Sequence, residues 1–401
     1  MSSLSSWRPP DPLQGVLGRL VPHQMRGLQV SRRVIWHAPR VNRTVDAASL
    51  SQPPKYRSDV HFSLLQRESG SERHDLPIWV SAPGAMQYEP ESWGPILRTD
   101  VPGVPGAFVL SNVLTPHECD QMRTLSEAMG YTTDAPVSLG RHIRRNENCV
   151  WIADDTLWKP IWTRVARHMP AEVAGGRPAG LNQRMRLYKY GVEDIFRLHT
   201  DGSWAGSAVD TRGKLVRDSY GDRWSQLTFL IYLDDDYDGG ETTFWVPDAA
   251  HSSSGEMHSV SVPLGGVLCF FHGEHPLSPL HEGSLVTRGI KRIVRSDVLY
   301  TYPHVDTASS QCDEAVEAGK SPYSGLASGA RVRLDGLQTA VEHNGKLGTL
   351  VSMQISPMGE RWAVRLDGEV AGNSEVSSDA PHSLISGDLI WVRPGHLHAI
   401  E

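Results

Sequence analysis

Short apolar stretches alternate with turn-forming residues from residue 184 to residue 300. Each stretch has the length of one β-strand, and together they cover 184–190, 226–233, 242–245, 258–262, 266–271, 277–282 and 289–300. The most apolar of them is Gln-Leu-Thr-Phe-Leu-Ile-Tyr-Leu at 226–233, and the Asp-Asp-Asp-Tyr-Asp-Gly-Gly segment that follows is typical of a turn. The pattern therefore predicts a domain that consists mainly of β-strands.

Two helices are predicted ahead of these strands. The segment Thr115-Pro-His-Glu118 places an N-cap residue before proline and an acidic residue three positions later, which is typical of a helix start. We expect this helix to run to Met129 and to end at Gly130, and a second helix to cover 155–168. Two helices followed by many short strands predict an α+β domain built on a β-sandwich or jelly roll.

The N-terminal part of the chain has a different composition. Residues 1–104 are rich in Pro, Ser and Arg and contain only short strand-like pieces such as 76–81, so we predict an irregular extension that is partly packed on the domain. The first fifty residues hold seven arginines, no lysine and two acidic residues. Such a composition is found in organelle transit peptides and also in plain surface extensions; we prefer the surface extension.

The C-terminal part is predicted to be a separate module. Residues 304–327 are rich in Ser, Ala, Gly and acidic residues, as in a linker. Residues 328–401 alternate apolar and polar positions, interrupted by Asn-Gly and Asp-Gly turns. Four or five short strands in this length predict a small SH3-like β-barrel, for which binding or support is the default role.

The composition excludes several classes of function. The net charge is −7, so no general attraction to nucleic acid is expected. The four cysteines are widely spaced, which predicts reduced and mostly buried thiols. No apolar run reaches the roughly 18 residues of a membrane span. We therefore expect a soluble protein, cytoplasmic by default, with organelle targeting by the Arg-rich N-terminus as the alternative.

A histidine and an aspartate stand near the end of the stretch from residue 184 to residue 204. His199 and Asp201 are two residues apart, so both side chains point to one face of a strand. Because the chain has 18 histidines and 46 acidic residues, this pair alone is weak evidence. A third ligand, His281, follows, and two histidines with one carboxylate form the facial triad of non-haem Fe(II) oxygenases. His272 and His275 are the rival third ligands; we prefer His281 because the Gly-Glu-His-Pro segment around His275 is typical of a loop.

A fixed positive charge is predicted beside this triad. Lys291 and Arg295 share one face of the strand at 289–300. A cation there can pair with the distal carboxylate of 2-oxoglutarate, and the hydroxyl of Tyr190 can donate to the same carboxylate. We prefer Lys291 as the anchor and keep Arg295 as the alternative.

Residues 105–303 resemble the Fe(II)/2-oxoglutarate dioxygenases of the prolyl 4-hydroxylase type. The matching positions are Tyr190, Phe196, His199-Thr-Asp201, Leu227-Thr-Phe-Leu-Ile-Tyr-Leu, Gly239-Gly-Glu-Thr, Gly265-Gly-Val-Leu-Cys-Phe-Phe, His281-Glu-Gly, Val286-Thr, Gly289 and Lys291. The resemblance implies a double-stranded β-helix with Fe(II) bound by His199, Asp201 and His281. It also implies 2-oxoglutarate held by Lys291 with help from Tyr190 and Thr228, consumption of O2, release of succinate and CO2, and dependence on ascorbate.

The chain departs from this family where the substrate is recognised. The loops with which collagen-type enzymes read peptides are not recognisable, and a long insertion at 205–223 follows the metal pair. Arg145 belongs to an Arg-Asn-Glu-Asn segment at the place of a polar strand that borders the substrate cleft, so we expect it to face substrate. The expected substrate is a prolyl or other peptidyl residue, or a small molecule. The alternative is a cupin-like jelly-roll metal protein without 2-oxoglutarate chemistry.

Overall fold

The computed structural model describes residues 29–39, 55–70, 72–89, 94–135, 143–248, 251–273, 275–301, 326–335, 344–356, 359–367, 389–392 and 397–400. These residues fall into two compact units, one within 10–302 and the other within 303–401. Most of the first fifty residues, for which a surface extension or a transit peptide was predicted, and most of the linker predicted at 304–327 lie outside the described residues.

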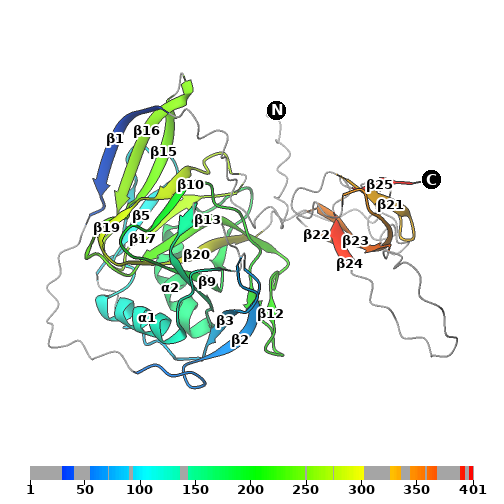
Figure 1. Cartoon of the computed structure of the whole chain (residues 1–401), viewed down its shortest axis with the longest axis horizontal. Coiled ribbons are helices and arrows are strands. Elements are labelled where there is room, and N and C mark those ends of the chain that lie inside the picture. Colours follow the sequence, from blue (N-terminus) through cyan, green and yellow to red (C-terminus); the bar gives the residue numbers. More distant parts are fainter. Residues whose placement is uncertain are drawn as a thin grey trace. The chain divides into compact units, whose positions relative to one another are not determined.

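Two large sheets build the first unit (Figure 1). The larger sheet has ten strands, with β8 (Pro178–Leu181) paired to β20 and the others in the order β2 (Phe62–Glu68), β3 (Leu76–Ser81), β7 (Glu147–Ile152), β9 (Arg184–Tyr190), β20 (Lys291–Thr301), β13 (Arg223–Tyr232), β17 (Val267–Phe271), β5 (Phe108–Ser111), β4 (Leu97–Asp100). The smaller sheet has six strands in the order β1 (Gln29–His37), β16 (His251–Ser261), β15 (Thr242–Asp248), β18 (Leu280–Gly283), β10 (Ile195–His199), β6 (Arg144–Arg145). Two two-stranded sheets complete the described part of the unit: β11 (Ala208–Val209) with β12 (Leu215–Val216), and β14 (Tyr237–Gly239) with β19 (Val286–Gly289).

The strand order in these sheets is that of a jelly roll. The relevant strands, in chain order, are β9, β10, β13, β15, β16, β17, β18 and β20. Numbered one to eight, they stand in the order 1-8-3-6 in the larger sheet and 2-7-4-5 in the smaller one. Neighbours among these eight strands are antiparallel. This interleaving is consistent with the predicted double-stranded β-helix core.

Two helices cover the outer face of the larger sheet (Figure 1). Helix α1 runs from Pro116 to Met129 with a complete capping box between Thr115 and Glu118, and Gly130 is its C-cap, as predicted. Helix α2 (Asp155–Val165) continues as one 3₁₀ turn (Ala166–His168), so the predicted second helix is also confirmed. Apolar residues of both helices share a core with the sheet. The opposite face of the sheet is left for the interior of the jelly roll.

The prediction of a largely irregular extension at 1–104 is confirmed only in part: the strand expected at 76–81 and the packing on the domain are found, but three further strands are present in the described part. Strand β1 extends the smaller sheet by pairing in parallel with β16, and β2 and β3 extend the larger sheet through β7. Strand β4 pairs with β5 at the other edge. These are edge or near-edge strands with many exposed side chains, so their sequences need few apolar residues and the period-2 pattern is weak.

The second unit contains one antiparallel sheet of five strands. Their order is β24 (Leu389–Val392), β23 (Gly359–Leu366), β22 (Leu347–Ser356), β21 (Arg331–Leu334), β25 (Leu397–Ala399). Its core is small and is built from Val332, Leu334, Leu350, Trp362, Val364 and Leu397. The strands predicted from the alternating pattern are present, and closure into an SH3-like barrel stays a prediction.

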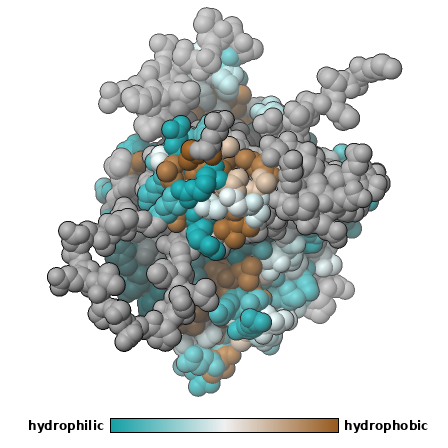
Figure 2. All heavy atoms as spheres, turned by 90° about the vertical axis from the view of Figure 1, so that its right-hand side faces the viewer, coloured by the Kyte–Doolittle hydropathy of each residue, from teal (hydrophilic) through white to brown (hydrophobic). Residues whose placement is uncertain are grey.

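The thiols and the surface of the described residues can also be compared with the predictions. Cys119, Cys149 and Cys269 are free and buried, as expected, and Cys312 lies outside the described residues. Within the described residues no helix is long and apolar enough to cross a membrane. Hydrophobic and hydrophilic residues are intermixed on the face shown in Figure 2.

Candidate metal centre and its pocket

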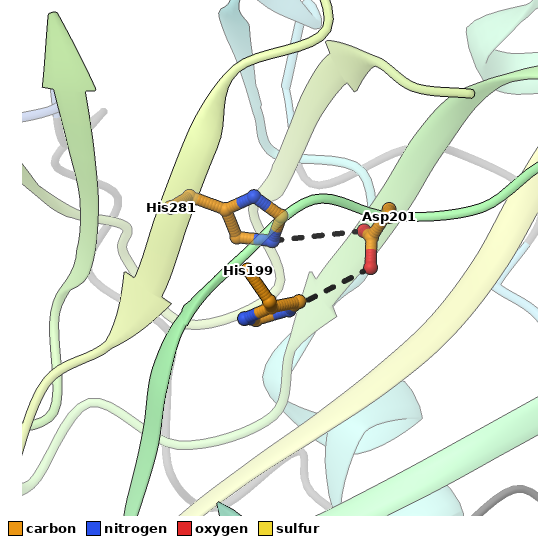
Figure 3. A group of neighbouring side chains, drawn as sticks. All are labelled: His199, Asp201 and His281. Carbon is orange, nitrogen blue, oxygen red and sulfur yellow. Dashed lines mark ion pairs between the residues drawn. The ribbon is translucent and has the colours of Figure 1, made fainter. Parts of the chain in front are cut away.

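The two histidines and the aspartate of the predicted triad lie together in the jelly-roll interior. His199 is the last residue of β10, and its cross-strand partner on β18 is His281. Asp201 follows two residues after His199, and its carboxylate oxygens lie 3.7 Å from Nε2 of each histidine. Figure 3 shows both imidazoles turned toward this carboxylate. One candidate ligand atom from each residue lies within 4.8 Å of the others, and all three side chains are buried.

Both imidazoles are held in the tautomer that a metal requires. Nδ1 of His199 lies 2.7 Å from the carbonyl oxygen of Arg197, and Nδ1 of His281 lies 3.2 Å from that of Pro279. A carbonyl can only accept, so each Nδ1 carries the proton and each Nε2 presents its lone pair to the centre. Burial lowers the pKa of both histidines, which keeps them neutral. Two neutral Nε2 atoms and one carboxylate are a donor set that fits Fe(II).

The carboxylate of Asp201 is fixed by two donors. Thr228 Oγ1 donates to Oδ2 at 2.7 Å, and Arg295 Nη1 donates to Oδ1 at 2.8 Å. Burial on its own would raise the pKa of Asp201, but Arg295 and the two histidines hold that pKa well below its usual range. Asp201 is therefore ionised and oriented before any metal binds.

His272, the first rival ligand, has a different role behind this carboxylate. The single hydroxyl proton of Thr228 goes to Asp201, so Nδ1 of His272, 2.9 Å from the Thr228 oxygen, must be the donor in that contact. Its Nε2 then accepts from Ser225 Oγ at 2.9 Å. Burial lowers the pKa of His272 to about 4, which keeps the ring neutral in this chain of hydrogen bonds. His272 thus orients Asp201 through Thr228.

His275, the second rival, is not part of the triad. Its ring stacks on Phe271 with 3.7 Å between centroids, and its Nδ1 accepts from the backbone of Leu277. Neither contact involves Asp201. Of the three histidines considered from the sequence, the structure groups only His281 with His199 and Asp201.

Lys291 is buried at the other end of the same pocket. The pocket is lined by Tyr188, Tyr190, Phe196, His199, Asp201, Leu230, Thr242, His281, Glu282, Gly283, Lys291, Ile293 and Arg295. The Lys291 ammonium donates to the carbonyl of Gly240 and lies over the rings of Tyr190 and Tyr232, 5.5 and 5.3 Å from their centroids. Burial lowers its pKa to about 8, only partly offset by Glu241. No carboxylate of the described residues forms an ion pair with it.

Three other residues were considered for binding 2-oxoglutarate, and they have different surroundings. Tyr190 lines the pocket beside Lys291, and its hydroxyl has no hydrogen-bond partner among the described residues. Thr228, which the resemblance assigns to 2-oxoglutarate, gives its hydroxyl to Asp201 instead. Arg295, the alternative anchor, is bound to Asp201 and to Asp297.

Arg145 does not point into this pocket. Its guanidinium contacts the carbonyl of Glu193 and the carboxylate of Asp194 outside it. Its neighbour Arg144 has the opposite orientation and lies over the rings of Tyr188 and Phe196, 4.1 and 4.9 Å from their centroids. Alternation along the strand explains the difference, because adjacent residues face opposite sides.

Sequence reasoning missed two buried charges in this interior. Arg186 and Asp297 are 8% and 0% exposed, and both lie near Arg295. Arg186 shares the inward face of β9 with Tyr188 and Tyr190, so the period-2 rule could have found it once Tyr190 had been placed.

Comparisons with known proteins give only a distant likeness. No protein-family model matches the chain, and no curated protein sequence matches it. Among solved structures, it is similar to a viral collagen prolyl hydroxylase from Paramecium Bursaria Chlorella virus-1 in a 2OG complex, with 14% identity, a TM-score of 0.31, and coverage of 52% of this chain and 97% of that one.

Two further solved structures are similar at the same level. A prolyl-4-hydroxylase from Pseudomonas putida has 14% identity and a TM-score of 0.31, with 48% of this chain and 92% of that one covered. A prolyl hydroxylase from Trichoplax adhaerens, in complex with a hypoxia inducible factor peptide fragment, has 14% identity and a TM-score of 0.34, with 48% and 83% covered. Likeness this distant carries no argument about activity, so the function is inferred from the site itself.

Proposed function

We propose that this protein is an Fe(II)- and 2-oxoglutarate-dependent dioxygenase that hydroxylates a C–H bond. One observation carries the proposal: the two-histidine, one-carboxylate set and an unpaired lysine line the same buried pocket. A metal site alone would not need Lys291, whose burial without a carboxylate is costly. A dicarboxylate cosubstrate that reaches from the triad to Lys291 would supply the missing negative charge.

The roles of the residues follow from their contacts. Fe(II), held by Nε2 of His199, Nε2 of His281 and a carboxylate oxygen of Asp201, would bring the keto acid of 2-oxoglutarate and O2 together for oxidative decarboxylation to succinate and CO2. Lys291 would pair with the distal carboxylate, assisted by the free hydroxyl of Tyr190. Apolar lining residues such as Leu230 and Ile293 exclude water from the space between.

The substrate is proposed only by class. A prolyl or other peptidyl residue is the reading that follows from the sequence resemblance, and a small molecule is the alternative. Arg144, rather than Arg145, is the residue of the polar strand that contacts pocket-lining rings, so we assign it the place beside substrate. Ascorbate is proposed as the reductant that sustains turnover.

An anaerobic titration tests the proposed function. The Fe(II) protein is mixed with 2-oxoglutarate and the visible spectrum is recorded, because bidentate binding of a keto acid to Fe(II) gives a charge-transfer band. Succinate is then measured after oxygen is admitted. The band and succinate are expected for the wild-type protein and not for His281→Ala. Tight metal binding without a band would instead indicate a cupin-like metal protein.

A further inference from the structure

Arg186 is a buried cation whose donors are not used. Arg186 is 8% exposed, yet its guanidinium makes no hydrogen bond to any described residue. The nearest carboxylate oxygen, Oδ2 of Asp297, is 4.0 Å from Nη1, which is beyond hydrogen-bond range. That oxygen itself has no hydrogen-bond partner. A guanidinium has five N–H donors, and leaving them unsatisfied in a protein interior is costly.

The charges around Arg186 make its position more unusual. Its cross-strand partner on β20 is Arg295, and two like charges directly opposite each other destabilise a sheet. Burial and Arg295 both lower the pKa of Arg186. The buried cations around the site are Lys291, Arg186 and Arg295, and the buried carboxylates are Asp201 and Asp297. Three cations face two anions, and an Fe(II) ion with a dianionic cosubstrate would leave this excess unchanged.

Arg186 lies at the end of the interior that the cosubstrate leaves free. On paired strands β9 and β20, Tyr190 is opposite Lys291, whereas Arg186 is opposite Arg295. These two cross-strand pairs are four positions apart, which is about 13 Å along a strand. Because Arg295 contacts Asp201, the metal triad is near the Arg186–Arg295 pair. The cosubstrate 2-oxoglutarate would extend from the triad toward Lys291.

The aromatic neighbours of Arg186 suit the binding of a planar anion. The indole of Trp204 covers one face of the guanidinium, with 4.4 Å from Cζ to the ring centroid, so the donors at its edge remain available. The pocket-lining Tyr188 lies two residues along the same face of β9. Burial raises the pKa of Tyr188, but Arg144, Arg186 and Arg295 outweigh it and lower that pKa overall, as expected where the potential is positive.

We propose that Arg186 binds a carboxylate of the substrate and that the enzyme therefore selects acidic substrates. This inference rests on the proposed function. The forked guanidinium pairs with a carboxylate in two parallel hydrogen bonds, which fixes the position of the substrate next to the metal and neutralises the excess charge. The carboxylate can belong to a free amino acid derivative or to an acidic side chain of a peptide.

The test compares acids with their amides on the full-length protein. Wild-type Fe(II) protein with 2-oxoglutarate, kept anaerobic, is titrated with N-acetyl amino acids and the matching N-acetyl carboxamides. A second arm uses end-blocked tripeptides that contain Asp or Asn. Binding is followed by calorimetry and by Trp fluorescence, to which Trp204 contributes. At least one acid in one arm is expected to bind about 10-fold more tightly than its amide, the usual effect of a charge-assisted pair.

Variants then assign the preference to Arg186. Arg186→Gln is expected to reduce the preference for acid over amide to less than about 2-fold. Arg186→Lys keeps the charge but cannot form two parallel hydrogen bonds, so it is expected to retain part of the preference. Lys189→Gln is the matched control, because Lys189 is on the same strand with its side chain paired to Glu127 and Glu147 on the other face. This control is expected to keep the full preference.

Two results would overturn the inference. One is the lack of any acid preference in both arms of the wild-type titration. The other is a preference that survives in Arg186→Gln, in which case Arg186 serves only Asp297; adding Asp297→Asn would then restore the thermal midpoint lost in the single variant. Failure of the proposed function is distinguishable, since the wild-type protein would then give no charge-transfer band with 2-oxoglutarate.

Discussion

Lys291 and Arg295 occupy the same face of one strand, four residues apart, in opposite electrostatic surroundings. Arg295 donates to Asp201 at 2.8 Å and to Asp297 at 3.3 Å. Lys291 has a carbonyl and two aromatic rings around it and no paired carboxylate. Two cations on a shared face therefore need not share a role. The paired cation belongs to the structure of the metal site, and the unpaired cation is available to a ligand.

The pKa values of the two cations express this difference. Burial would lower both, yet the pKa of Arg295 is raised because Asp201 and Asp297 outweigh its desolvation. The pKa of Lys291 falls to about 8 because Glu241 only weakly opposes burial. A buried cation at that value is destabilised by its surroundings, and an incoming carboxylate relieves the cost.

The largest effect is expected on Fe(II) binding when one ligand of the triad is removed. His281→Ala should weaken Fe(II) binding by more than about 100-fold, since loss of even an outer partner of a metal ligand costs 10–100-fold. Calorimetric titration with Fe(II) under anaerobic conditions measures this. His275→Ala is the control and should bind Fe(II) normally. Equal losses in both variants would show that the triad has been assigned wrongly.

A crossed pair of substitutions separates the two cations. Lys291→Met should weaken 2-oxoglutarate by about 10–100-fold, the effect of losing a charge-assisted pair, with little loss of stability. Arg295→Met should lower the free energy of unfolding by about 3 kcal/mol, because it leaves Asp201 and Asp297 buried without their cation. Titration of the charge-transfer band and urea unfolding of the apo-protein give the two quantities. If Arg295→Met lost 2-oxoglutarate and Lys291→Met lost stability, the roles would be reversed.

Much of this comparison could be predicted from the sequence. The shared face of His199 and Asp201 and the shared face of Lys291 and Arg295 follow from the period of a strand, whereas the choice of His281 as the third ligand also drew on the family resemblance. Helix α1 was predictable to its ends because its capping box is local. These features depend on neighbours within a few residues, which a sequence displays directly.

The partners of the polar groups could not be predicted in the same way. Arg295 and Asp201 are 94 positions apart. Thr228 on β13 reaches His272, which follows the neighbouring strand β17, and Asp201, which follows β10 of the other sheet, so its two contacts depend on how the fold places both sheets. The choice between Arg144 and Arg145 depends on a one-residue register, which composition does not reveal. Strands β1, β2 and β4 were not predicted because they lie at sheet edges and carry little apolar pattern.

Binding of 2-oxoglutarate should depend on pH through Lys291. Lys291 must be protonated to pair with a carboxylate, and its pKa in the free enzyme is about 8. The dissociation constant of 2-oxoglutarate should therefore rise by up to about 10-fold per pH unit above pH 8 and be flat below it. Lys291→Met should remove this dependence. A flat profile from pH 7 to pH 9.5 in the wild-type protein would contradict the assignment.

The same pKa also predicts how stability changes with pH. Between about pH 8 and pH 10.4 the folded apo-protein has Lys291 neutral while the unfolded chain keeps it charged, so the unfolded state binds more protons. This residue therefore makes the free energy of unfolding rise with pH over that window. The difference between wild type and Lys291→Met in urea unfolding isolates the contribution.

The smallest effect is expected for Thr228, which contacts Asp201, the partner of Arg295, and not Lys291. Thr228→Val keeps the shape of the side chain but removes the donor to Asp201 and leaves Nδ1–H of His272 without an acceptor. We expect Fe(II) affinity to fall by about 10-fold, as for other outer partners of metal ligands, and the 2-oxoglutarate dissociation constant at saturating Fe(II) to change by less than about 2-fold. Ser225→Ala, two hydrogen bonds further from Asp201 than Thr228, should weaken Fe(II) binding less. If Thr228→Val instead weakened 2-oxoglutarate and left Fe(II) binding intact, Thr228 would contact the cosubstrate as the sequence resemblance implies, and Arg295 alone would orient Asp201.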